Sequence, residues 1–382
     1  MIENPHQRHC QRGLTLIELM VVMAVSLILT LAVTAVLIAG EGQKRTTTSV
    51  NDREQSGLHA ALLLDRVLRS AGSGLAQTVS VGGYGCALAA SKDGVPILSA
   101  ATAWPAPFAA FPAQPRVAPA LIQKGEGNAS DIIMVMSGSA AAGDAPRPLL
   151  AGGSASQLQL NGTLQLKGGD IVLITSGADC VIEQVKDDFT GDASTTQLDL
   201  GGDYHAGGNP LPGVVAGGAS LSVLGNHGPA DNHPQFMLYG VGANHELAGY
   251  DMLQMDSSQV QALADGVQRL YAVYGVDAEG RGKVSEWVDP SGDWGIDALA
   301  ADPARLRKIL AIRFALVLRS STAEKKPVEQ AAVPADGKIV VFGDLGEGRQ
   351  RTLELSDDDR RYRYQVIDTK VPLRNALLAF AS

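Results

Sequence analysis

The sequence that decides the fold is Arg12-Gly13-Leu14-Thr15-Leu16-Ile17-Glu18-Leu19-Met20-Val21. It opens an apolar run that continues to Ala39 and contains one charged side chain, that of Glu18. As an α-helix, the run from Leu14 to Ala39 would be roughly 39 Å long, at about 1.5 Å per residue. The hydrocarbon core of a bilayer is about 30 Å thick. The run therefore predicts a membrane-spanning helix over residues 14–39.

Glu18 distinguishes this run from ordinary apolar segments. A secretory signal peptide has an apolar region of about 7–15 residues with a cleavage site after it. This run is longer, and Glu18 lies where the apolar region of a signal peptide normally contains no charged residue. A plain single-pass anchor explains the length but gives Glu18 no role. A carboxylate costs about 2.5–3.5 kcal/mol at the centre of a membrane helix and less near its end, so this acid requires an explanation.

The stretch resembles the class III signal of type IV pilins and pseudopilins. That signal has a short polar, basic leader, then a Gly, then an apolar helix with Glu at its fifth position. Counting from Leu14 places Glu18 fifth. The resemblance implies that residues 1–13 are a leader, that a prepilin peptidase cuts between Gly13 and Leu14, and that the new N-terminus is methylated. Major pilins usually begin with Phe; minor pilins vary at this position, so Leu14 fits them.

The motif is physically coherent. Cleavage before the apolar run, rather than after it, leaves the helix in the membrane. The new α-amino group of Leu14 would then lie near a carboxylate four residues further on. A buried charge is tolerated when it is paired, and in a helical assembly the best partner for Glu18 is a neighbour's amino terminus. We therefore expect Glu18 to set the register of subunits whose helices are buried together in a filament core.

Composition and charge bound the remaining possibilities. The chain has 382 residues and a net charge of −9, and removal of the leader leaves 29 basic and 39 acidic residues, or −10. This argues against a nucleic-acid-binding surface, which is normally basic. Arg8 and Arg12 precede the apolar run, and positive residues favour the cytoplasmic side. We therefore expect the inner membrane as the site of the helix and the periplasm as the site of the C-terminal part.

Cysteine usage agrees with an oxidising compartment. Cys10 would be lost with the leader, which leaves the pair Cys86 and Cys180. In the periplasm the simplest expectation is a disulfide between them. The alternative is two unrelated buried thiols.

The chain beyond residue 39 is expected to be a helical continuation followed by a β-rich domain. Apolar residues at helical spacing, among them Leu58, Leu62 and Leu68, predict an amphipathic helix over 40–72. Residues 73–382 form the expected domain, with a long loop at about 81–120. Asp302-Pro303 marks a short helix by its N-cap and N1 residues. One long helix followed by mainly antiparallel strands is an α+β class, pilin-like.

Alternating and apolar runs predict the strands of this domain. Gln157–Leu160 and Thr163–Leu166 alternate on either side of Asn161-Gly162, which indicates a hairpin. In Ala311–Ser320, alternation places Ile312, Phe314, Leu316 and Leu318 on one face. The other expected strands are 132–136, 171–175, 180–185, 197–200, 221–224, 236–239, 266–276, 339–342 and 362–367.

Four further features are together similar to the PilW-type minor pilins of type IV pilus assembly. They are the helix end with Arg69-Ser70-Ala71-Gly72, the segment from Gly169 to Cys180, the strands Val267–Asp277 and Arg313–Ser320, and the terminal Val371-Pro372-Leu373-Arg374-Asn375. The resemblance implies a subunit that primes pilus assembly and lies at or near the pilus tip with other minor pilins.

The same resemblance implies a set of partners. They are the other minor pilins and the major pilin, contacted through the N-terminal helix, together with the prepilin peptidase, the inner-membrane assembly platform and a tip adhesin. Two alternatives stay open. One is a J-type pseudopilin of type II secretion, which has the same N-terminal cleavage signal and apolar helix. The other is a pilus-associated adhesin.

No catalytic or metal-binding constellation emerges from the sequence. Asp277–Lys283 looks like a calcium loop, but Arg281 occupies a ligand position, so a plain turn is favoured. His227, Asp231 and His233 have metal-ligand spacing without a fourth ligand nearby. Asp357-Asp358-Asp359 is followed at once by two Arg residues and reads as a solvated charge run. We expect neither an enzyme nor a metal or cofactor.

Overall fold

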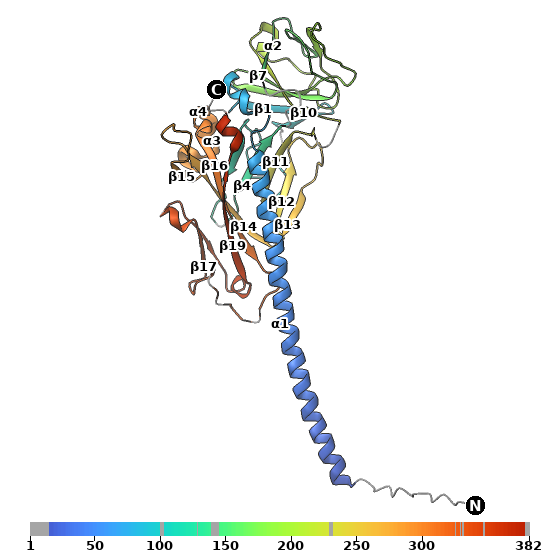
Figure 1. The fold of residues 1–382 in the computed structure, drawn as a ribbon, viewed down its shortest axis with the longest axis vertical. Coiled ribbons are helices and arrows are strands. Elements are labelled where there is room, and N and C mark those ends of the chain that lie inside the picture. The colour runs from blue at the N-terminus through green and yellow to red at the C-terminus, as the bar shows by residue number, and fades with distance from the viewer. Residues whose placement is uncertain are drawn as a thin grey trace, which may run out of the picture. The chain divides into compact units, whose positions relative to one another are not determined.

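The computed structural model describes residues 15–99, 103–127, 129–138, 145–228, 232–324, 326–328, 330, 332–346 and 348–378. The chain divides into two compact units, Met1–Asn51 and Asp52–Ser382. Helix α1 (Leu16–Ser70) runs through most of the first unit and into the second (Figure 1). It continues without interruption through the expected membrane segment and its expected continuation, and ends two residues before the expected boundary at 72.

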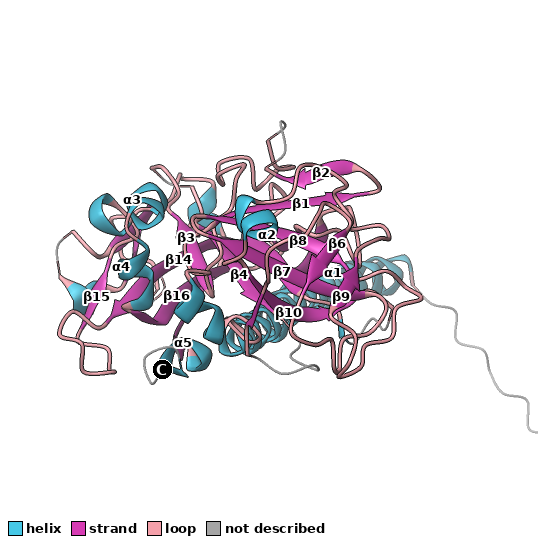
Figure 2. Cartoon of the chain, turned by 90° about the horizontal axis from the view of Figure 1, so that it is seen from above, coloured by secondary structure: helices cyan, strands magenta, loops and turns pink. Residues whose placement is uncertain are grey.

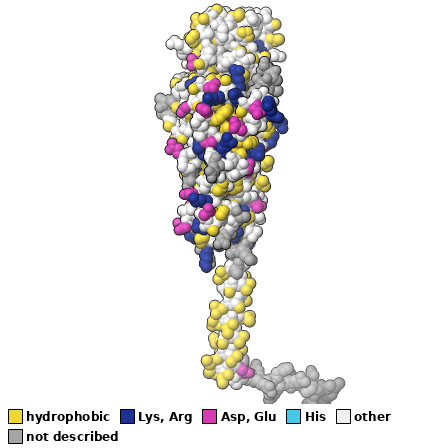
Figure 3. All heavy atoms as spheres, turned by 90° about the vertical axis from the view of Figure 1, so that its left-hand side faces the viewer, with side chains coloured by type: hydrophobic (Ala, Val, Ile, Leu, Met, Phe, Trp, Pro, Cys, Tyr) yellow, Lys and Arg dark blue, Asp and Glu magenta, His cyan; other side chains and the backbone are white. Residues whose placement is uncertain are grey.

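The first unit is dominated by an apolar helix surface. Leu16–Ile38 has a mean hydropathy of 2.8, and none of this segment is buried. On the face seen in Figure 3, hydrophobic side chains follow one another along this segment of α1. Its 23 residues correspond to roughly 34 Å of helix. The segment is long and apolar enough to anchor the chain in a membrane, as the sequence predicts.

The second unit is built mainly from antiparallel sheets, which confirms the predicted α+β class. Within the described residues the largest sheet has the order β2-β1-β8-β7-β10-β5, and Figure 2 shows β2, β1, β8, β7 and β10 following one another in this order. The bounds are β1 Ala87–Lys92, β2 Val95–Leu98, β5 Arg147–Pro148, β7 Asp170–Ser176, β8 Asp179–Gln184 and β10 Ser220–Asn226. Only the pairing of β1 with β8 is parallel among the described strand pairs.

Two other sheets and two ribbons complete the second unit. Their orders are β13-β12-β11-β4-β3, β15-β14-β16-β19, β17-β18 and β6-β9. The bounds are β3 Ala120–Gln123, β4 Ile132–Ser137, β6 Gln157–Gln159, β9 Gln197–Asp199, β11 Gln235–Val241, β12 Glu246–Asp251, β13 Gln261–Asp265, β14 Val267–Val276, β15 Glu286–Val288, β16 Ile309–Arg319, β17 Lys338–Val341, β18 Arg351–Glu354 and β19 Tyr364–Pro372.

Short helices occupy several connections. They are η1 Ala76–Val81, α2 Pro212–Ala216, η3 Gly292–Trp294, α3 Ile296–Ala301, α4 Pro303–Arg307, η4 Gly343–Leu345, η5 Asp359–Arg361 and α5 Arg374–Leu378. Helix α4 begins where Asp302-Pro303 predicts it. The Asp302 side chain accepts a hydrogen bond from the Ala304 N–H, which is the geometry of an N-cap.

The main core lies where the second-unit part of α1 packs on the sheets. Ala60, Leu64 and Leu68 are fully buried there. They share a cluster with Ile312, Phe314, Leu316 and Leu318 of β16, the face that the sequence predicts. The opposite face of β16 carries Ala315 and Val317, which pack with β17 and β18 in a separate cluster. Burial of each such Leu or Phe side chain contributes about 1.5–3 kcal/mol.

The expected long loop at 81–120 is wrong for part of its length. Residues 87–92 and 95–98 are paired strands, and β1 also pairs with β8. The sequence of β1, Ala-Leu-Ala-Ala-Ser-Lys, does not predict a strand, because Ala and Lys are depleted in strands. Burial of Leu88 and Ala90 in the main core nevertheless holds the strand in place.

The expected hairpin around Asn161-Gly162 is also wrong. Strand β6 pairs with the distant β9, which places Leu158 opposite Leu198. Residues 163–166 form a turn instead, with the Leu166 N–H donating to the Thr163 carbonyl oxygen. Leu158, Leu166 and Leu198 all enter one buried cluster against β7 and β10. Burial in this cluster outweighs the local turn preference.

Candidate functional site

The N-terminal end of α1 is closed by a reciprocal pair of hydrogen bonds between Thr15 and Glu18. The Thr15 N–H and hydroxyl both donate to Glu18 Oε2, each at 3.0 Å. The Glu18 N–H donates to Thr15 Oγ1 at 3.3 Å. This is a capping box, which satisfies N–H groups that the first helical turn leaves without intrahelical partners. Glu18 is exposed, so its carboxylate can also meet a neighbouring group.

The other polar side chains of the apolar segment are satisfied within the helix. Ser26 donates to the Met23 carbonyl oxygen at 2.9 Å. Thr30 and Thr34 donate to carbonyl oxygens one turn earlier, at 2.6 and 2.7 Å. Serine and threonine hydroxyls in membrane helices bond to the backbone in this way. The segment is therefore suited to surroundings without water, where every polar group must be satisfied internally.

The cleavage and methylation site expected at Gly13 and Leu14 lies outside the described residues. Glu18 lies in the first turn of α1. Thr15 was not singled out by the sequence reasoning. The signal for it was present, because Thr-x-x-Glu ahead of an apolar run is the sequence pattern of a capping box.

The C-terminal end of α1 is held by a residue from the far end of the chain. Asn375 Nδ2 donates to the carbonyl oxygens of Ser70 and Ala71 at 3.2 and 3.0 Å. Gly72 follows with a φ of 79°, where a Cβ would also approach Pro119 to 3.1 Å. Two of the motifs used for the family resemblance, at 69–72 and 371–375, are thus in direct contact.

A close approach between α1 and β16 requires a glycine at residue 57. A Cβ on Gly57 would overlap the Leu318 side chain. One residue earlier, the Ser56 hydroxyl donates to the Asp265 carbonyl oxygen at 2.8 Å. These contacts hold this part of α1 against β13 and β16 within the second unit.

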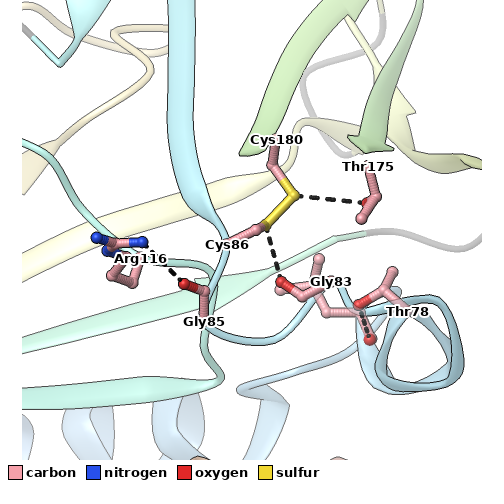
Figure 4. Close-up of a disulfide and its surroundings, with 8 residues drawn as sticks. Thr78, Gly83, Gly85, Cys86, Arg116, Thr175 and Cys180 are labelled. Carbon is pink, nitrogen blue, oxygen red and sulfur yellow. Dashed lines mark hydrogen bonds between the residues drawn. A yellow bond between two sulfur atoms is a disulfide. The ribbon is translucent and has the colours of Figure 1, made fainter. Parts of the chain in front are cut away.

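Cys86 and Cys180 are joined by a disulfide with a Cα–Cα distance of 5.7 Å, which is ordinary disulfide geometry. Figure 4 shows the bond, with Thr175 beside Cys180 and Arg116 bound to the Gly85 carbonyl oxygen. Both sulfur-bearing residues are 2% exposed. The bond connects the segment leading into β1 with β8, two strands that also pair directly.

Comparison with known families decides the identity. Residues 237–375 match the family model described as Type IV Pilus-assembly protein W, PilW. Residues 8–34 match the prokaryotic N-terminal methylation motif. The chain carries the PilW domain and the prepilin methylation motif, which together support a PilW-type minor pilin of type IV pilus assembly. No curated protein and no solved structure gives a significant match.

The matched ranges correspond to definite parts of this minor pilin. The methylation motif, residues 8–34, covers much of the apolar helix segment. The PilW match begins within β11 and ends at Asn375, so it includes the residue that contacts the end of α1. Domains of these families are structural rather than enzymatic. The six-stranded sheet and the ribbon β6-β9 lie outside both matched ranges.

The loop that resembles a calcium site is organised around one carboxylate. Asp277 accepts hydrogen bonds from the N–H groups of Glu279 and Gly282, at 3.2 and 2.6 Å. Burial raises the pKa of Asp277, but the N–H groups of this turn outweigh it and hold the pKa below its ordinary value. Arg281 forms an ion pair with Glu279 instead of leaving that position open. The arrangement is that of a polar turn between β14 and β15.

The two described histidines of the 227–233 segment are engaged with acids and backbone. His233 Nδ1 lies 2.9 Å from Asp256, and its Nε2 lies 2.8 Å from the His227 carbonyl oxygen. His227 lies 3.4 Å from Asp203. Asp231 lies outside the described residues. In the Asp357–Asp359 run, Asp359 accepts from Ser356, and Asp358 pairs with Arg361.

Proposed function

We propose that this minor pilin is anchored in the inner membrane by α1, with its second unit in the periplasm, and that it helps to prime pilus assembly and lies at or near the tip. The observation that carries the proposal is the combination of an exposed apolar helix segment with a large multi-sheet unit. The helix can be covered by lipid or by other pilin helices. A bulky unit is hard to repeat along a tightly packed shaft, which favours low copy number and a terminal position.

The proposed processing and assembly sites are Gly13, Leu14 and Glu18. Cleavage between Gly13 and Leu14 would place the new amino terminus next to Thr15, and therefore at the capping box. Glu18 would then pair with the amino terminus of a neighbouring pilin in the filament. The partners proposed are other minor pilins and the major pilin, the prepilin peptidase, the inner-membrane assembly platform and a tip adhesin.

Processing and assembly can be separated with two variants. Replacement of Gly13 by a larger residue should block cleavage, so the variant should keep the electrophoretic mass of the precursor. Glu18→Ala should be cleaved and inserted normally but incorporated poorly into pili. Thr15→Val is the matched control, because it removes the hydroxyl contact and keeps the carboxylate. A Glu18→Ala chain recovered in sheared pili at the wild-type level would contradict the proposed pairing.

The position in the pilus is tested by copy number and by location. Sheared pili should contain far less of this chain than of the major pilin. Antibodies against the second unit should label pilus ends. Abundance equal to that of the major pilin, or labelling along the whole shaft, would refute the tip proposal and leave the membership of the family unaffected.

A further inference from the structure

A cavity of about 250 Å³ lies on one face of the six-stranded sheet and is lined in part by α2. Its floor comes from β1, β7 and β8, with Ala87, Ala89 and Ile174 among the residues that face it. Its other walls come from β6, from the residue that follows β9, and from Leu211 and Val214 at α2. The cavity lies outside both family matches, so the family assignment does not explain it.

Most of the cavity wall is apolar, and its charged groups are acids. Leu158, Leu200 and Val214 supply part of the apolar lining. Glu183 and Asp179 are the charged side chains that line it, and among the described residues no Lys, Arg or His lines it. An apolar pocket with a few convergent polar groups is the usual form of a small-molecule or side-chain binding site.

Glu183 is a buried carboxylate with one oxygen unused. The residue is 6% exposed. Its Oε2 lies 2.7 Å from His205 Nδ1 and accepts from the Ala206 N–H at 3.2 Å. Since a carboxylate accepts, the His205 Nδ1 carries the hydrogen in this pair. Within the part of the chain that the structure describes, no group donates to Oε1.

This arrangement leaves Oε1 open to a donor from outside the chain. Oε1 is not among the buried polar atoms that lack a hydrogen-bond partner, so it is accessible from the cavity. Burial raises the pKa of Glu183, and the hydrogen bonds from His205 and from the Ala206 N–H offset only part of that rise. The two bonds at Oε2 fix the orientation of the carboxylate, and a positive group at Oε1 would favour its ionised form. A cation brought to Oε1 would complete the pairing, and an attached apolar chain would fill the rest of the cavity. An anion or a neutral apolar molecule would satisfy only one of these two features.

We propose that this cavity binds a primary alkylammonium group, with the ammonium on Glu183 and the alkyl stem against β1 and β6. The same chemistry occurs in a soluble amine and in the side chain of a lysine on a partner pilin. The site is separate from α1 and does not depend on the pilus function proposed above.

The test uses the full-length chain in detergent micelles and n-butylammonium chloride as the probe. A ligand that binds only the folded protein raises Tm, and the rise grows with the logarithm of ligand concentration once that concentration exceeds Kd. Tm is followed by tryptophan fluorescence, because Trp104, Trp287 and Trp294 all belong to the second unit. We expect Tm to rise with butylammonium concentration along this logarithmic curve, and not to rise with sodium chloride or sodium butyrate at the same ionic strength.

Two variants and one control show whether the rise comes from this cavity. Glu183→Gln keeps the side-chain size and should weaken the apparent affinity at least tenfold. Ala89→Leu keeps the charge, fills the apolar part of the cavity, and should weaken it similarly. Glu354→Gln removes one negative charge at the exposed ion pair with Lys338 and should change nothing. Each variant is compared with its own ligand-free Tm, so a change in basal stability does not obscure the result.

The proposal is overturned if butylammonium acts no differently from sodium, or if both cavity variants respond as the wild type does. A length series distinguishes a site from general charge attraction: hexylammonium and butylammonium should bind more tightly than ethylammonium. Binding of N-acetyl-lysine methylamide at least as tight as that of butylammonium would assign the site to a partner's lysine. Binding of the simple amines alone would assign it to a soluble amine.

Discussion

Asn375 makes a quantitative prediction because one amide group holds the end of α1. Its Nδ2 donates to two carbonyl oxygens of the last turn, at 3.2 and 3.0 Å. A hydrogen bond contributes about 0.5–1.5 kcal/mol net, so Asn375→Ala should lower the free energy of unfolding of the second unit by about 1–3 kcal/mol.

Asn375→Asp should be worse than Asn375→Ala. It loses the same two donors and places a carboxylate beside the carbonyl end of a helix, which costs about 0.3–1 kcal/mol more. The control is Arg374→Ala, since Arg374 is the exposed neighbour, and exposed substitutions usually change stability by about 0.5 kcal/mol or less.

The assay is guanidinium unfolding of the full chain in micelles, followed by tryptophan fluorescence. The midpoints should fall in the order wild type and Arg374→Ala, then Asn375→Ala, then Asn375→Asp. If Asn375→Asp unfolds at the wild-type midpoint, the amide does not cap α1, and the link between the helix end and the C-terminal segment is refuted.

Three other predictions concern the second unit. Cys86 and Cys180 are 94 residues apart, so reduction of their disulfide should lower the free energy of unfolding by about 4.7 kcal/mol in the chain-entropy model. An unchanged unfolding midpoint in the presence of reductant would contradict this. Gly57→Val should destabilise by about 1–3 kcal/mol, measured by the same unfolding assay, because its side chain would overlap Leu318. Burial raises the pKa of Asp131 to about 6, so its folded form holds a proton that the unfolded form has lost. The contribution of Asp131 to the free energy of unfolding should therefore fall by about 2–3 kcal/mol as pH rises from about 4 to 6. Asp131→Asn should remove this pH dependence. If the free energy of unfolding of the variant and of the wild type changed with pH in the same way, the prediction would be wrong.

The sequence predicts those elements whose structure depends mainly on residues close to one another in the chain. The alternation in Ala311–Ser320 predicts both β16 and its inward face, because the sheet is buried differently on its two sides. Asp302-Pro303 predicts the start of α4, because capping involves only the first turn. The Cys86–Cys180 disulfide followed from the two cysteines that remain after the expected leader and from an oxidising compartment. The role expected of Glu18 rested on the resemblance to pilin signals.

Long-range pairing was beyond such signals. β1 is Ala-rich and looks like a loop until β8 lies beside it. The Asn161-Gly162 turn signal is strong, yet β6 pairs with β9 because Leu158 and Leu198 then enter one cluster. Asn375 and Ser70 are 305 residues apart, and nothing near either residue indicates the other. The cavity at Glu183 is assembled from several separate segments, so no single stretch of sequence could reveal it.

The hydroxyl groups of Ser26, Thr30 and Thr34 affect how easily this subunit moves from the lipid bilayer to contact with other helices. Each hydroxyl is already bonded to a backbone carbonyl of α1, so the helix presents the same apolar surface to lipid tails and to neighbouring helices. Moving the helix from lipid into a helix bundle therefore breaks no hydrogen bond along this segment. The free energy of that transfer then depends mainly on the apolar area in contact, and polar interactions change only at Thr15 and Glu18.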